Sequence, residues 1–118
     1  MESNVDVTKL KKKDTLRGAN QNQENYIMTT VESQVWNRLS HEPISRNALR
    51  LRTGYSDRQI RKAVQNLRNN GYPVISNSDK NGYWIARSED EVYMLVNELR
   101  SRASEMLKTA RSLENVRL

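Results

Sequence analysis

Four long polar side chains recur at helical spacing near the middle of the chain. They occur at i, i+3, i+4 and i+7, so a helix would present them on one side. Guanidinium and amide groups can each form paired hydrogen bonds with a base edge, Arg with guanine and Gln with adenine. The chemistry predicted for this side is therefore non-covalent recognition rather than bond making. The four residues are Arg58, Arg61, Lys62 and Gln65.

The positive charge of the chain is concentrated in the same region. Residues 26–87 hold ten basic and four acidic side chains, a balance of +6, which equals the net charge of the whole chain. Residues 1–25 carry +1 (five basic, four acidic) and residues 88–118 carry −1 (five basic, six acidic). After Asp57 no acidic residue occurs before Asp79. A solvated surface helix usually mixes both signs, so this bias favours a surface that binds a polyanion over a merely solvated one.

Other chemistry has little support in the sequence. The chain has no Cys, and His41, its one His, has no evident Asp or Ser partner, which predicts a solvated or capping role. The acidic run SEDE (88–91) is explained by a helix start, and the four Gly are isolated. We therefore predict no enzyme activity, no cofactor and no metal. Without a signal peptide or a membrane span, we expect a cytoplasmic protein with no membrane partner.

Capping signals divide the chain into elements. Thr29, Ser56 and Ser88 are each followed three residues later by Glu or Gln, the pattern of a capping box, and Ser45 could cap a further helix. The periodicity predicts helices over 30–40, 46–53, 57–70 and from 89 to about 116. Strands are predicted at 73–76 and 83–87 around a turn at 77–82, with a short strand at Ile44. Residues 1–25 are predicted to be a flexible polar and basic arm.

This order of elements resembles a winged helix-turn-helix over residues 26–87. The segments LRLRTGYS (49–56) and GYPVIS…GYWIA are similar to domains of the biotin-repressor class. The whole chain is closest in pattern to small winged-helix proteins encoded by phages and prophages of Gram-positive bacteria. The resemblance implies an α+β, mostly helical fold with three helices, a β-hairpin wing and a long C-terminal helix.

The resemblance also implies which residues contact DNA. Helix 57–70 would be the recognition helix, with Arg58 and Arg61 reading bases. Asp57 could accept from cytosine, although stabilisation of the helix dipole is the favoured role. Arg50 replaces a small residue usual in the motif, which either changes the tilt of helix 46–53 or makes Arg50 a phosphate contact. The complete predicted set is Ser56, Asp57, Arg58, Arg61, Lys62, Gln65, Arg46, Arg50 and, at the wing tip, Lys80 and Asn81.

The C-terminal segment, residues 88–118, carries a different pattern. Apolar residues alternate at spacings of four and three, which is typical of a coiled-coil seam and predicts dimerisation. The alternative is a helix folded back over its own domain. The seam consists of Val92, Val96, Leu99, Ala103, Met106, Ala110 and Leu113.

These patterns predict a homodimer that binds double-stranded DNA sequence-specifically. It would act as a phage-type transcriptional regulator or as an origin-binding replication factor. The alternative is a protein-interaction adaptor that uses the winged helix and the C-terminal helix to dock on a replication or transcription protein.

Overall fold

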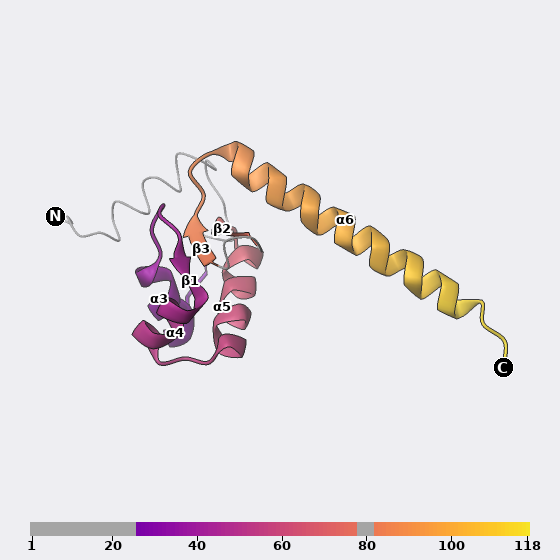
Figure 1. Cartoon of the computed structure of the whole chain (residues 1–118), viewed down its shortest axis with the longest axis horizontal. Helices are drawn as coiled ribbons and strands as arrows, with labels where there is room; N and C mark the ends of the chain where they lie inside the picture. The colour runs from indigo at the N-terminus through magenta and orange to yellow at the C-terminus, as the bar shows by residue number, and fades with distance from the viewer. Residues whose placement is uncertain (1–25, 78–81) are drawn as a thin grey trace.

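The computed structural model describes residues 26–77 and 82–118 of the chain, which fold into four helices and three strands. The architecture is α+β and mostly helical (Figure 1). In chain order the elements are α3 (Thr30–Arg38), β1 (Ile44–Ser45), α4 (Arg46–Thr53), α5 (Asp57–Asn69), β2 (Val74–Asn77), β3 (Gly82–Ile85) and α6 (Glu89–Glu114). The predicted elements between 26 and 118 are present, with ends that differ by a few residues. The predictions for residues 1–25, and for Lys80 and Asn81 at 78–81, lie outside the described residues.

The strands form one antiparallel sheet in the order β1-β3-β2. Ile44 pairs with Tyr83, which confirms the short first strand. Asn77 pairs with Gly82, so both residues belong to strands and the predicted turn at 77–82 is shorter than expected. The prediction that the last strand reaches residue 87 is wrong. The strand ends at Ile85, and the Arg87 N–H bonds instead to the Glu91 side chain, 2.8 Å away, as the chain turns into α6.

The sheet separates two apolar clusters, because successive strand side chains point to opposite faces. Tyr83 and Ile85 face the main core. Trp84 and Ala86 face the other way and pack with Ile75 against the start of α6. Helices α3, α4 and α5 cover the first face, where the main core includes Val35, Leu39, Leu49, Ile60, Val64, Leu67 and Val74.

Hydroxyl caps fix the helix starts. Thr29 and Ser56 form full capping boxes with the residues three positions later, and Ser45 accepts from the Ala48 N–H at 3.0 Å. Ser88 caps α6, but the reciprocal bond predicted for Glu91 does not form. The Glu91 carboxylate accepts instead from the Arg87 backbone and from Trp84 Nε1, at 2.8 and 3.2 Å.

Helix α6 leaves the domain as a straight extension (Figure 1). All 26 residues of α6 are described, and none of them is fully buried. Only its first turns meet the sheet, where Val92 and Leu95 pack on the second cluster. Because most of α6 extends away from the sheet, it does not adopt the alternative arrangement of a helix folded back over its own domain.

The described part of the chain contains no helix with an apolar stretch long enough to cross a bilayer.

Candidate nucleic-acid interface

Helices α4 and α5 meet at a sharp turn. Gly54 ends α4 with φ +77°, a left-handed conformation that side-chain-bearing residues rarely adopt. Tyr55 packs partly into the core, and Ser56 accepts from the Gln59 N–H at 3.1 Å to begin α5. The turn thus sets the angle between two helices whose outer sides are both rich in arginine.

The amphipathic pattern of α5 determines which side faces outward. Its apolar residues (Ile60, Ala63, Val64 and Leu67) are all buried. The remaining side of its first turns is therefore presented to solvent. The exposed residues there include all four predicted at helical spacing, namely Arg58, Arg61, Lys62 and Gln65.

Helices α4 and α5 carry seven basic residues and one acidic residue between them. Arg46 and Arg50 of α4, both predicted to contact DNA, are exposed, as is Arg52. Six of these seven basic side chains are exposed, and a surface with this excess of cations can attract phosphates over a distance of about one Debye length, ~8 Å at physiological salt. The seven are Arg46, Arg50, Arg52, Arg58, Arg61, Lys62 and Arg68.

Asp57 joins the two helices electrostatically. Its carboxylate lies 3.4 Å from Arg46 Nε of α4 and 3.0 Å from Arg61 Nε of its own helix. The predicted role at the positive end of the helix dipole fits its place as the first residue of α5. Both arginine side chains are about half exposed or more, at 47% and 65%. Exposed pairs of this kind contribute ~1 kcal/mol or less, so a ligand could displace Asp57 from either arginine at little cost.

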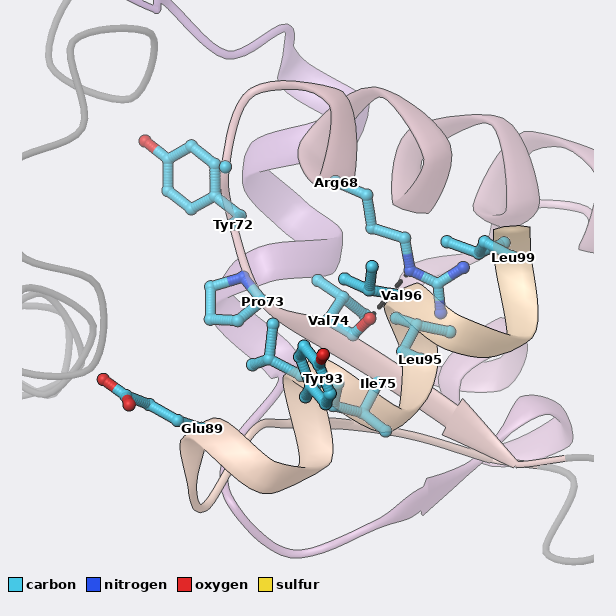
Figure 2. A pocket seen from close by; sticks show the side chains of 12 residues that line it. Arg68, Tyr72, Pro73, Val74, Ile75, Glu89, Tyr93, Leu95, Val96 and Leu99 are labelled. Carbon is cyan, nitrogen blue, oxygen red and sulfur yellow. Dashed lines mark hydrogen bonds between the residues drawn. The ribbon is translucent and has the colours of Figure 1, made fainter. Parts of the chain in front are cut away.

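Arg68 does not belong to the exposed basic surface. Its Nε donates to the Val74 carbonyl oxygen at 2.7 Å (Figure 2). Its Nη2 donates to Ser76 Oγ at 3.0 Å. Burial lowers the pKa of the Arg68 guanidinium. Arg68 continues the Ile60–Val64 stripe at i+4, and this spacing explains its inward position.

Glu32 has a role that sequence analysis missed. Its side chain is 2% exposed, and it accepts hydrogen bonds from the Tyr26 hydroxyl, from Asn66 Nδ2 at 2.8 Å and from the Thr29 N–H at 3.0 Å. Burial alone would raise the pKa of Glu32, but these hydrogen bonds outweigh it and hold the pKa below its ordinary value. The carboxylate also raises the pKa of Tyr26 to about 12. The network fixes α3 against the inner side of α5 and so supports the basic surface from behind.

His41 differs from its prediction as a solvated or capping side chain. It is half-buried, and its Nδ1 lies 3.1 Å from the Ile85 carbonyl oxygen, to which it donates. The His41 side chain is half-buried because the loop after α3 crosses the end of β3. At this crossing the Ile85 N–H also bonds to the Ser40 carbonyl oxygen at 2.7 Å. His41 thus secures the loop to the end of β3.

The fold brings most of the predicted site residues together on neighbouring helices. Ser56, Asp57, Arg58, Arg61, Lys62, Gln65 and the α4 arginines lie on two adjoining helices, while Lys80 and Asn81 are not described. No known protein family, curated protein or solved structure matches this chain. Its function therefore has to be inferred from its own residues.

Proposed function

We propose that the chain binds double-stranded DNA sequence-specifically through a winged helix-turn-helix. In this proposal α4 and α5 form the helix-turn-helix, α5 is the recognition helix, and β2 with β3 forms the wing. The observation that carries the proposal is the division of α5 into a buried apolar side and an exposed polar side. Every apolar residue of its stripe is buried, and the exposed side of its first turns offers Arg58, Arg61, Lys62 and Gln65 together.

The chemistry of these side chains suits the major groove. An α-helix fits that groove, and Arg and Gln are the side chains that pair bidentately with guanine and adenine there. In helix-turn-helix proteins the N-terminal residues of the second helix contact base edges, which assigns base reading to Arg58 and Arg61. Arg46 and Arg50 would hold the neighbouring phosphates. Asp57, by pairing with Arg46 and Arg61, would keep both guanidinium groups oriented in the free protein.

We infer that the biological role is that of a phage-type transcriptional regulator or an origin-binding replication factor. The runner-up is an adaptor that docks on a replication or transcription protein, and the observation that favours it is the apolar surface of α6. The two differ in their response to salt. A DNA-binding protein loses affinity steeply as salt rises, because binding releases counterions from the duplex, whereas an adaptor need not bind duplex DNA at all.

The deciding experiment is a binding-site selection on random duplexes, followed by fluorescence anisotropy across a salt series. We expect one preferred sequence and a steep negative slope of log affinity against log salt. Lys80→Ala should weaken binding to preferred and random duplexes alike and reduce the slope by about one. If no sequence is enriched, or if affinity for the enriched duplex does not fall as salt rises, the proposal fails.

A further inference from the structure

The outer part of α6 exposes large apolar side chains that the chain itself does not cover. Met106, Leu107 and Leu113 are 68%, 59% and 66% exposed, and Leu99, nearer the domain, is 41% exposed. Figure 1 shows that the C-terminal part of α6 extends away from the sheet. An amphipathic helix of this kind requires a partner for its apolar side.

A second uncovered apolar surface lies where α6 passes β2. A groove of about 450 Å³ runs between the first turns of α6 and the segment Gly71–Ile75. Figure 2 shows Val96 and Leu99 of α6 on one side of this groove and Pro73 and Val74 on the other. Val92, Val96 and Leu99 line the groove and also begin the 4-3 seam of α6. The groove and the seam are thus one continuous surface, which a single long apolar helix could cover.

The charges of α6 are divided along its length. Residues 89–98 hold four acidic residues and no basic one, namely Glu89, Asp90, Glu91 and Glu98. Residues 99–117 hold five basic and two acidic residues. If two copies of α6 paired in parallel, the acidic half of one helix would lie against the acidic half of the other. If they paired antiparallel, the acidic half of each helix would lie against the basic half of the other, which is the favourable arrangement.

We propose that a second copy of this chain covers both surfaces through an antiparallel α6–α6 pair. In a register that sets Ala103 of each copy against Met106 of the other, Leu99 lies opposite Ala110 and Val96 lies opposite Leu113. The last turns of each α6 then lie in the groove of the other copy, beside Arg68 and Pro73. The small side chains of Ala103 and Ala110 allow the helices to approach closely, and Leu113 fills the groove.

This register also sets the distance between the two domains. The two copies of Val92, where each α6 packs on its own sheet, would be 25 residues apart along the paired axis, about 38 Å at the helical rise of ~1.5 Å per residue. One turn of duplex DNA measures ~34–36 Å. The antiparallel pair therefore suits two half-sites about one turn apart. Only the spacing of the half-sites rests on the proposed function, because the pairing rests on α6 and the groove beside it.

The chain contains no cysteine, so cross-linking can test the pairing directly. Leu99→Cys and Ala110→Cys both change exposed positions and should leave the fold intact. Mixed under oxidising conditions, the two variants should form a disulfide-linked heterodimer. Neither variant alone should form a covalent dimer. The two copies of the same cysteine would be about 16 Å apart along the paired axis, which is beyond the reach of a disulfide. A covalent dimer from either variant alone would show a parallel pair and overturn the proposal.

Sedimentation equilibrium of the parent chain without DNA provides the second measurement. We expect a dimer whose Kd rises when NaCl is increased from about 50 to about 500 mM, because opposite charges across the pair are screened. Leu113→Asp should raise the Kd about tenfold or more, whereas Ser101→Asp, on the opposite side of α6, should leave it within about threefold. A parent chain that is monomeric at tens of micromolar overturns the proposal, whether or not the same chain binds duplex DNA.

Discussion

Helices α5 and α6 are both amphipathic, yet only one of them completes a core. The apolar side of α5 is buried to 3% exposure or less, against α3 and the sheet. The apolar residues of α6 beyond the sheet are 41% to 68% exposed. Hydrophobic periodicity thus shows which side of a helix will be covered but not by what. In α5 the cover comes from the same chain, and in α6 we propose that it comes from a second copy.

The largest expected effect contrasts two leucines. Leu67→Ala in α5 should reduce the free energy of unfolding by ~2–5 kcal/mol, because it leaves a cavity in a fully buried site. Leu107→Ala in α6 should change it by only about 0.5 kcal/mol or less in dilute protein, where copies are dissociated. Urea unfolding followed by circular dichroism measures both. Equal losses would mean that α6 contributes to the core of its own domain.

The next effect concerns the charge buried behind α5. Glu32→Gln should cost ~1.5–3 kcal/mol at neutral pH, because hydrogen bonds to an ionised group are lost. The folded-state pKa of Glu32 is lowered, so its contribution is present above the unfolded pKa of ~4.3 and is lost as pH falls through the folded value. Unfolding free energies between about pH 6 and pH 3 should therefore fall less in Glu32→Gln than in the parent. A variant as acid-sensitive as the parent would contradict this role.

A smaller effect, on affinity rather than stability, tests the exposed side of α5. Arg58→Ala and Arg61→Ala should each weaken binding to the selected duplex by ~1–3 kcal/mol and relax sequence preference, because paired contacts to bases are lost. Lys108→Ala removes one exposed positive charge from α6 and provides the control, with an expected loss below ~0.5 kcal/mol. Fluorescence anisotropy with selected and random duplexes measures all three. Parent-like affinity in both Arg variants would mean that α5 does not read the site.

The smallest effect is expected from the N-terminal segment. Deleting residues 1–25 should leave the Tm nearly unchanged, because the segment has too little apolar sequence to join a core. Tyr26 must be retained, since its hydroxyl donates to Glu32 and its ring lies 6.4 Å from that of Tyr72. Differential scanning calorimetry of the two chains makes the comparison. A large fall in Tm would move the domain boundary towards the N-terminus.

The elements could be predicted from the sequence because their signals are local. Ser56 with Gln59, the left-handed Gly54 and the stripe of α5 all act within a few residues of one another. The long-range polar contacts could not be predicted in this way. Glu32 meets Asn66 across 34 positions and His41 meets Ile85 across 44, and no spacing rule connects them. Glu91 illustrates the limit of a local rule. Its carboxylate was expected to accept from the Ser88 N–H, but it accepts from the Arg87 N–H and the Trp84 indole instead.

That same carboxylate makes the junction between domain and helix stiff. Glu91 binds the Arg87 backbone, the Arg87 guanidinium and the Trp84 indole, and Arg87 lies over the Trp84 ring at 5.4 Å. A helix of 26 residues measures about 39 Å, so a tilt of about 10° at this junction would sweep its far end through about 7 Å. The helix can therefore act as a lever that pivots where Glu91, Val92 and Leu95 hold it to the sheet. A small shift of the side chains around Trp84 would produce a larger displacement at the C-terminal end of α6. A force applied at that end would act first on the hydrogen bonds of Glu91.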